Sequence, residues 1–159
     1  MMQIFLKELS ILVLILMISA CGFQLRGNIQ ANFDSISISG GTPSFNKTLQ
    51  RKFRQGGISI KSVSEAEKIV EIITNNFTKT ILTLTGTGLV SEYQLDYVVT
   101  YRFKSKDGQW NQPLSIEASR TYTYDDSDIL AKDEEEKRLV SGMEDQLIKT
   151  MATQISLSK

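Results

Sequence analysis

The feature that most restricts the fold of this chain is a strict alternation between residues 92 and 104. Residues at odd positions are aromatic or aliphatic, and residues at even positions are mostly polar or charged. The odd set is Tyr93, Leu95, Tyr97, Val99, Tyr101 and Phe103, and the even set is Glu92, Gln94, Asp96, Val98, Thr100, Arg102 and Lys104. Because successive side chains of a strand point to opposite faces, this pattern predicts a long strand with one buried face. Other elements must cover that face.

Three further segments have the composition of strands. Residues 35–39 alternate Ser with Ile and are followed by two glycines, which favour a turn. Residues 68–85 are rich in Ile, Val and Thr, and they predict one long strand or two linked strands broken at Asn75-Asn76. Residues 114–124 form the last predicted strand. Together with residues 92–104, these segments predict a sheet of about four strands that is mostly antiparallel.

Two segments predict amphipathic helices that can cover this sheet. The first begins at Thr42-Pro43, an N-cap followed by proline at the first helical position, and ends at Gly56-Gly57. The second lies near the C-terminus. Each carries apolar residues four apart, which are Phe45, Leu49 and Phe53 in the first and Leu139, Met143, Leu147, Met151 and Ile155 in the second. We therefore predict an α+β two-layer sandwich, with both helices packed on the aromatic face and a polar face opposite.

The first 20 residues have the pattern of a secretory signal. A short charged start precedes residues 9–18, which are almost wholly apolar, and Ser19-Ala20 are small. A membrane-spanning helix needs roughly 20 apolar residues, about twice this run, so an anchor helix is the weaker alternative. Cys21 is the only cysteine and has no internal disulfide partner. We predict a signal peptide at 1–20, a covalent lipid on Cys21, a tether at 22–32 and one domain within 21–159.

The composition narrows the functional class. The chain has 18 basic and 18 acidic residues, which argues against nucleic-acid binding because that function favours a basic domain. It contains no His, so the usual transition-metal ligand and the usual general base are missing. No paired-carboxylate or nucleophile motif replaces them. We therefore predict a protein that is not an enzyme and that holds no metal and no cofactor apart from the lipid.

Three short motifs, in a fixed order along the chain, carry a family resemblance. The first is Cys-Gly-Phe-Gln-Leu-Arg-Gly at 21–27, and the second is Ser-Glu-Tyr-Gln-Leu at 91–95. The third is Ser-Arg-Thr-Tyr at 119–122, followed by Ile-Leu-Ala-Lys-Asp-Glu-Glu at 129–135. Together they resemble the lipopolysaccharide (LPS)-assembly lipoprotein family LptE. The resemblance implies a lipid-anchored protein on the periplasmic face of a Gram-negative outer membrane, which plugs the β-barrel LptD and helps LPS reach the cell surface.

The resemblance also indicates binding residues. LPS carries phosphates and carboxylates, and the family's basic residue in the Leu-Ala-Lys-Asp segment corresponds to Lys132, with an ordinary solvated helix-start residue as the alternative. The family's second basic position falls on the uncharged turn at 84–89, and Lys79 is only a distant substitute. The candidates for contact with a polar barrel lumen are Gln94, Asp96, Thr100, Arg102 and Arg120. For Arg120, an ion pair with an acid such as Glu92 or Glu117 is the alternative.

A second hypothesis keeps the lipid anchor and drops the barrel. It describes a stand-alone periplasmic lipoprotein that binds a lipid or peptidoglycan. Such a protein needs a ligand pocket between the sheet and the helices, whereas a barrel plug needs a polar outer surface.

Overall fold

The structure, a computed structural model of the chain, describes Ile29 and residues 31–157. The predicted signal peptide, Cys21 and most of the predicted tether lie outside the described residues. The elements in chain order are β1 (Ser35–Gly40), α2 (Pro43–Gln55), β2 (Ser59–Ile60), β3 (Lys68–Leu84), β4 (Val90–Ser105), β5 (Leu114–Thr123), a short 3-10 helix η1 (Asp126–Asp128) and α3 (Ile129–Leu157). None of the described helices is long and apolar enough to cross a membrane.

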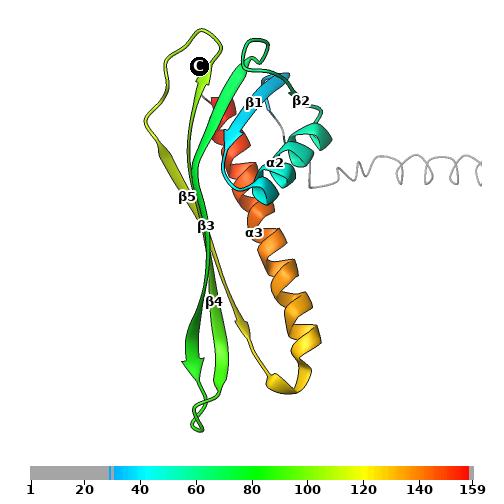
Figure 1. Cartoon of the computed structure of the whole chain (residues 1–159), viewed down its shortest axis with the longest axis vertical. Coiled ribbons are helices and arrows are strands. Elements are labelled where there is room, and N and C mark those ends of the chain that lie inside the picture. The colour runs from blue at the N-terminus through cyan, green and yellow to red at the C-terminus, as the bar shows by residue number, and fades with distance from the viewer. Residues whose placement is uncertain (1–28, 30, 158–159) are drawn as a thin grey trace, which may run out of the picture.

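The strands form one twisted sheet with both helices on the same side (Figure 1). Its order is β2-β1-β3-β4-β5. β1 runs parallel to β2 and β3, and the two long pairs, β3 with β4 and β4 with β5, are antiparallel. The predicted two-layer α+β fold is confirmed, with five strands in place of about four. The extra strand is β2, whose two residues are too few to show a period in the sequence and are held by pairing with β1.

The connection from β1 to α2 is a tight turn against β3. Gly40 and Gly41 have φ angles of 75° and 69°, which glycine adopts without strain. The helix begins at Pro43 as predicted, but the Thr42 hydroxyl does not cap it. The Thr42 amide instead donates to Asn75 Oδ1 at 2.8 Å, and Asn75 Nδ2 donates to Thr42 Oγ1 at 2.9 Å. The turn is therefore fixed to β3 by a side-chain amide.

β3 is one continuous strand with a bulge at Ile73, and its register with β4 shifts again between Ile81 and Leu84. Ile72 lies opposite Tyr101 and Thr74 lies opposite Thr100, so Ile73 is an extra residue in the ladder. Of the two alternatives predicted for this segment, the single long strand is the one that forms, without a break at Asn75-Asn76. The extra residue changes which residues of β3 face the helices. Before the bulge, the even-numbered side chains face the helices. After it, the odd-numbered side chains Asn75, Phe77, Lys79 and Ile81 face them.

Most of the core lies in one half of the molecule, which we call the packed half. It comprises β1, β2, α2, residues 68–76 of β3, 97–105 of β4, 114–118 of β5 and 143–157 of α3. The core side chains are fully or almost fully buried. They include Ile36, Phe45, Leu49, Phe53, Val70, Tyr101, Met143, Leu147, Met151 and Ile155. The apolar faces predicted for both helices thus form the core, apart from the half-buried Leu139. Ile29, from the end of the predicted tether, is buried against the end of α2.

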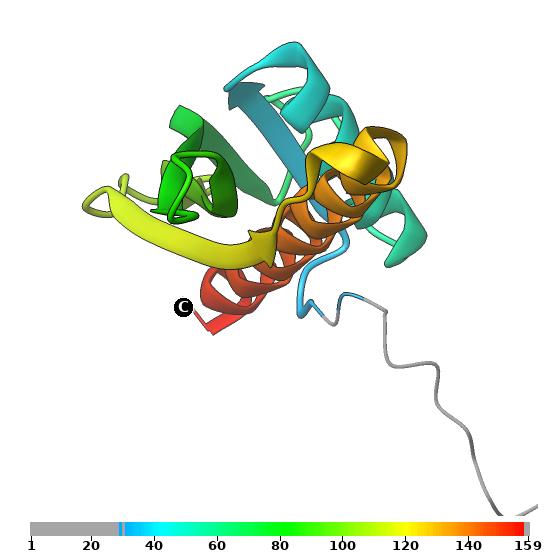
Figure 2. The same cartoon turned by 90° about the horizontal axis from the view of Figure 1, so that it is seen from below.

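The other half, the distal half, comprises residues 77–84 of β3, 90–96 of β4, 119–123 of β5 and 129–142 of α3. There the sheet has only the first half of α3 opposite it (Figure 1). The view from below shows α3 lying across one side of the sheet (Figure 2). Large apolar side chains are left exposed in this half, namely Phe77, Ile81, Leu82, Leu84, Leu89, Ile129 and Leu130, of which Leu89 lies in the hairpin turn. The distal half therefore presents exposed apolar side chains of the kind that the packed half buries in its core.

Candidate partner-binding surfaces

The sheet face turned away from the helices, which we call the outer face, is mostly polar, with apolar exceptions such as Val98 and Ile69. Four of the five predicted barrel-contact residues, Gln94, Asp96, Thr100 and Arg102, lie on it at alternate positions of β4. Short hydroxyl side chains flank them on the neighbouring strands, namely Thr74, Thr78 and Thr80 on β3 and Ser115, Ser119, Thr121 and Thr123 on β5. These small side chains make a surface that can exchange many hydrogen bonds with a partner.

Asp96 is the centre of the hydrogen bonding on the outer face. It accepts bonds from Ser119 Oγ at 2.6 Å and from Gln94 Nε2 at 3.0 and 3.1 Å. The bonds from Ser119 and then Gln94 hold the pKa of the Asp96 carboxyl below its usual value. Above it, Thr100 and Ser115 hydroxyls lie 3.1 Å apart. The outer face therefore carries a fixed negative charge within a row of hydroxyls.

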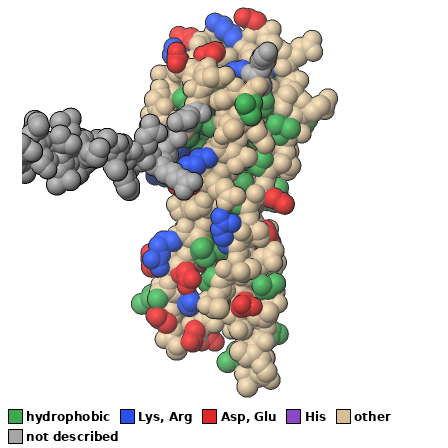
Figure 3. All heavy atoms as spheres, turned by 180° about the vertical axis from the view of Figure 1, so that it is seen from behind, with side chains coloured by type: hydrophobic (Ala, Val, Ile, Leu, Met, Phe, Trp, Pro, Cys, Tyr) green, Lys and Arg blue, Asp and Glu red, His purple; other side chains and the backbone are tan. Residues whose placement is uncertain are grey.

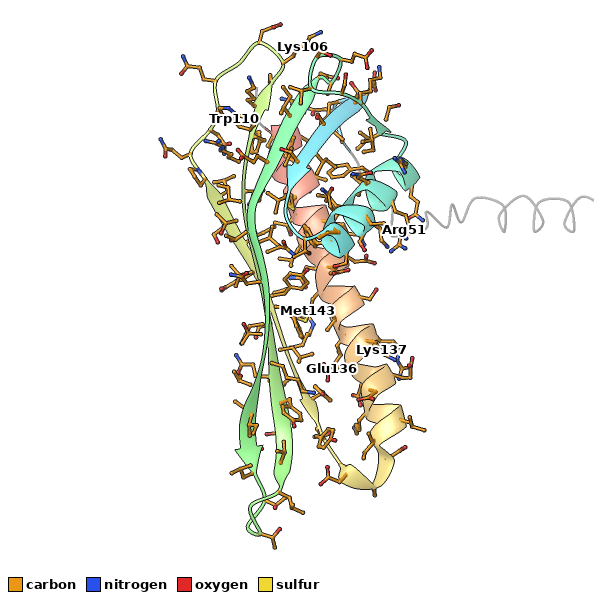
Figure 4. The ribbon with its side chains drawn as sticks, viewed as in Figure 1. Arg51, Lys106, Trp110, Glu136, Lys137 and Met143 are labelled. Atoms are coloured by element: carbon orange, nitrogen blue, oxygen red, sulfur yellow. The ribbon has the colours of Figure 1, made fainter. Side chains whose placement is uncertain are left out.

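Arg102 stands at the upper end of the outer face and is already engaged within the chain. Its Nε lies 2.5 Å from Glu71 Oε2, and its guanidinium lies 4.6 Å from the centre of the Trp110 ring. Lys104 also approaches that ring, at 5.5 Å. Figure 4 places Trp110 beside the upper strands. A contact from Arg102 to a partner would have to extend this cluster or break it.

Arg120, the fifth predicted contact residue, lies on the opposite face. In the register of β5 it stands opposite Leu95, whose side chain is buried beneath α3. Arg120 donates to Gln146 Oε1 of α3 and to the Ser119 carbonyl, both at 2.6 Å. Glu92 and Glu117 lie on the outer face, so the ion pair considered from the sequence is not formed. Arg120 instead ties the β5 edge to the middle of α3.

The distal half is held together by a polar cluster between β3, β5 and α3. Lys79 Nζ lies 2.6 Å from Glu136 Oε2 and 4.1 Å from the centre of the Tyr93 ring. The Tyr122 hydroxyl donates to the same Glu136 oxygen at 2.5 Å. Figure 4 shows Glu136 directed from α3 toward the sheet and Lys137 directed away from it. Four side chains from four elements therefore meet where the core ends.

The electrostatics of this distal cluster favour its charged form. Partial burial lowers the pKa of Lys79, but the hydrogen bonds of its ammonium to Glu136 and Tyr122 outweigh this effect and raise that pKa well above its usual value. Burial raises the pKa of Glu136, and the bonds from Lys79 and Tyr122 overcome this and leave the pKa lowered. Burial, followed by the bond to Glu136, raises the pKa of Tyr122 to about 12. Lys79 and Glu136 thus stay ionised at neutral pH.

Lys132, the predicted LPS contact, lies one helical turn before Glu136 on α3. Its ammonium bonds to Glu135 Oε2 at 2.8 Å and reaches Thr123 Oγ1 of β5 at 3.5 Å. Lys79, which the sequence marked only as a distant substitute, is bonded to the next turn of the same helix. The structure therefore brings the two lysines toward one region of α3, although they are 53 residues apart in the sequence.

Acidic and basic side chains are mixed around the start of α3, as the view from behind shows over the lower part of the molecule (Figure 3). The β3–β4 hairpin, by contrast, turns at residues 85–89 without any charged residue. Its turn is closed by the Thr85 amide, which donates to the Leu89 carbonyl at 2.7 Å. The expected second basic position is thus absent from the hairpin, and Lys79 is a basic residue on the strand that leads into it.

The fold also occurs in bacterial lipoproteins of known structure. An uncharacterized lipoprotein B from Nitrosomonas europaea is 26% identical, with a TM-score of 0.69 and coverage of 85% of this chain and 90% of that one. A rare lipoprotein B from Shewanella oneidensis is 26% identical, with a TM-score of 0.62 and coverage of 76% and 96%. A minor lipoprotein from Acinetobacter baumannii, 19% identical, shares the fold at a TM-score of 0.61, with coverage of 80% and 93%. No curated protein sequence matches the chain.

The sheet, its two helices and these neighbours define a class, the small α+β domains of bacterial lipoproteins. A family model described as lipopolysaccharide-assembly, LptE, matches residues 33–155. The match spans most of the chain, so the chain belongs to the LptE family. The resemblance predicted from the three motifs is thereby confirmed.

Proposed function

We propose that this chain is a lipid-anchored protein of the outer membrane that acts without catalysis in delivering LPS to the cell surface. The observation that carries the proposal is the LptE family match over residues 33–155. The anchor in this proposal is a lipid on Cys21, attached after removal of residues 1–20. Replacement of the lipidated residue tests it, because Cys21→Ala should release the protein from membranes. Unchanged sedimentation with the membrane fraction would contradict the anchor.

The proposed partner is the β-barrel LptD, and the outer face is the surface proposed to contact it. The lumen of a large barrel is polar, and the outer face offers hydroxyls, the Gln94 amide and the Asp96 carboxylate. Such groups can exchange their bonds to water for bonds to the lumen wall at little cost. In this arrangement the helices and the core face away from the wall that the sheet contacts.

Co-purification of tagged full-length chain from its own host tests the partner. LptD should accompany the wild-type protein in detergent extracts, and a chain that is wholly monomeric there would contradict the proposal. Thr100→Lys combined with Thr121→Lys adds two cations to the outer face and should reduce the LptD recovered. Thr150→Lys combined with Thr153→Lys adds the same two cations on α3 and is the matched control. Equal loss in both variants would exclude the outer face as the contact.

LPS is proposed to meet the chain at Lys132. Because Lys132 is bonded to Glu135, an LPS phosphate would have to compete with that carboxylate. Lys132→Glu should lower the LPS that co-purifies with the full-length protein, and Lys137→Glu, five residues further along α3, is the control. Equal LPS content in the two variants would place the contact elsewhere.

A stand-alone lipid-binding role has less support from the structure. A hollow of about 320 Å³ lies along α3, and it is lined by Asp133, Glu136, Lys137, Val140, Ser141 and Glu144. Small-molecule sites are mostly apolar with few polar groups, whereas four of these six residues carry charged groups. The hollow is thus a poor fit for an acyl chain.

A further inference from the structure

The second half of β3 forms an open sheet edge. β1 pairs with β3 only from Lys68 to Ile72, and within the described part of the chain no strand continues that pairing along residues 74–84, which we call the open edge. In an antiparallel pair, every second residue directs its backbone N–H and C=O away from the partner strand. The open edge therefore presents a row of backbone groups that another strand could pair with.

The side chains of the open edge that face α3 are partly bare and apolar. Phe77 and Ile81 lie opposite Tyr97 and Tyr93 in the register, yet they are 42% and 56% exposed. The Phe77 ring packs edge-on against Tyr97 at 5.9 Å between ring centres, so it is positioned but not covered. Lys79, between them, is held inward by Glu136 and Tyr93. An exposed lysine on an edge strand discourages another strand from pairing with it. Lys79 cannot have this effect, because its charge is turned inward and paired.

The wall of α3 beside this edge is acidic. The hollow along α3 contains three carboxylates, from Asp133, Glu136 and Glu144, and the cation of Lys137. Lys79 already pairs with Glu136, and Arg51 of α2 partly offsets the charge of Glu144, so Asp133 and Glu144 are the carboxylates left to attract a further cation. Glu136 bonds to Lys79 of β3, and Glu144 accepts a bond from the Tyr97 hydroxyl at 3.4 Å, so the hollow borders the gap between α3 and the sheet. Burial, followed by repulsion from Asp145, raises the pKa of Glu144. A cation placed here would relieve that repulsion.

The charge of this wall argues against a second copy of the chain as the occupant. Two copies paired through their open edges would be related by a two-fold axis perpendicular to the continuous sheet. Both α3 helices would then lie on the same side of that sheet, with their acidic walls facing each other across the seam. Like charges so placed repel. A segment that brings basic side chains has the opposite, favourable interaction.

The sheet edge along β5 is less suited to pairing than the open edge, and the two-residue strand β2 at the opposite end of the sheet is too short for it. α3 covers the inner face of β5, where Ile116, Ala118 and Tyr122 are buried. Pro113 stands immediately before the strand and Arg120 projects from it toward Gln146. Proline and charged side chains are devices that discourage pairing at an edge. The open edge of β3 has neither Pro nor an unpaired charge along its residues 74–84.

We propose that the open edge of β3 binds an extended segment of a partner protein as an added strand, with Lys or Arg at alternate positions facing α3. Backbone hydrogen bonds to the edge supply affinity that does not depend on sequence, and the alternate side chains supply selectivity. The basic side chains meet Asp133 and Glu144, and the strand covers Phe77 and Ile81. The inference does not rest on LptD or LPS, because it uses the backbone of the open edge and its side chains that face α3. Thr74, Thr78 and Thr80 of the same strand point to the outer face.

The test uses isotope-labelled full-length chain in detergent micelles, titrated with an octapeptide probe of sequence Thr-Lys-Val-Lys-Thr-Lys-Val-Thr. NMR shifts should change along residues 74–84, and amide hydrogen exchange there should slow. Two further peptides distinguish the contribution of charge from that of backbone hydrogen bonds. A peptide with Glu at the three Lys positions should bind about fivefold or more weakly, given the energies of partly exposed ion pairs, and a peptide N-methylated at alternate residues should not bind.

Two protein variants test whether Asp133 and Glu144 cause the preference for a basic peptide. Asp133→Asn combined with Glu144→Gln should weaken the Lys peptide about fivefold, while Glu117→Gln, on the outer face, should leave its binding unchanged. Five outcomes would overturn the proposal: no shifts at millimolar peptide, equal binding of the N-methylated peptide, equal binding of the Glu peptide, equal effects of the two variants, or shifts confined to β5. Dimerisation through the same residues, seen by sedimentation, would assign the edge to a second copy instead.

Discussion

The packed half and the distal half of this molecule are stabilised in different ways. In the packed half, Phe45, Leu49 and Phe53 of α2 are fully buried with the end of α3 against the sheet. In the distal half, the sheet meets only the first half of α3, and the Lys79–Glu136–Tyr122 contacts stand where a core would be. Stability is therefore concentrated in one half, which leaves the other free to present backbone edges, hydroxyls and bare apolar side chains to partners.

The largest expected contrast between the halves comes from removing one aromatic ring in each. Phe53→Ala should lower the free energy of unfolding by about 3–5 kcal/mol, because it leaves a cavity in a closed core. Phe77→Ala should cost about 1 kcal/mol, because the Phe77 side chain is already 42% exposed and leaves no closed cavity. Urea denaturation of both variants measures the difference, and equal losses would remove the distinction between the halves.

Two glycine substitutions sharpen the same comparison at the level of the backbone. Gly40 has a φ of 75°, and a Cβ there would lie 2.2 Å from the Ile72 carbonyl oxygen, so Gly40→Ala should cost about 2 kcal/mol or more. Gly88, in the distal hairpin, has a φ of 83° but nothing within 4 Å, so Gly88→Ala should cost only the conformational strain of about 1 kcal/mol. Thermal unfolding compares the two, and a larger effect at Gly88 would contradict this account.

The cluster of Lys79, Glu136 and Tyr122 makes the stability of the distal half depend on pH. Glu136 has a lower pKa in the folded chain than its ordinary 4.5, so its contribution is fully present above pH 4.5 and is lost as the pH falls through the lowered value. Glu136→Gln should therefore cost about 1 kcal/mol or less at pH 7, and the difference from wild type should shrink below pH 4.5. Unfolding midpoints measured across this range check it. A difference that is independent of pH would assign the loss to packing.

The smallest effect on stability is expected for an ion pair that is largely exposed to water. Lys137 and Glu134 are bonded at 2.7 Å on the exposed side of α3, with side chains 70% and 65% exposed. Lys137→Ala should leave the unfolding midpoint within experimental error, because water and salt screen such a pair. A loss as large as that of Glu136→Gln would mean that exposed pairs on α3 also hold the distal half together.

Much of the fold could be predicted because its strongest patterns are local. The alternation of residues 92–104 and the four-residue spacing in both helices depend on neighbours in the sequence, and the structure confirms them. The bulge could not be predicted, because Ile72, Ile73 and Thr74 carry no alternation that marks the extra residue. For β2 the sequence indicates only a short extended piece at 58–60, since pairing with β1 and not composition makes it a strand of the sheet.

The candidate surfaces could be predicted only in part. Gln94, Asp96, Thr100 and Arg102 follow from one strand's own alternation, whereas the face of Arg120 depends on the register between β5 and β4. The hydroxyls of β3 and β5 were overlooked, although alternating Thr in residues 74–80 and 119–123 was a usable signal. The bond between Lys79 and Glu136 joins residues 57 apart, and no local pattern marks such a pair.

The bulge at Ile73 decides what each surface of the distal half contains. With one residue fewer at this point, every later side chain of β3 would turn to the opposite face. Phe77, Lys79 and Ile81 would stand among the hydroxyls of the outer face, and Thr78 and Thr80 would lie beneath α3. Glu136 would lose its cation at the same time. A single-residue deletion at Ile73 would therefore exchange the chemistry of two surfaces without changing any of the residues that form them.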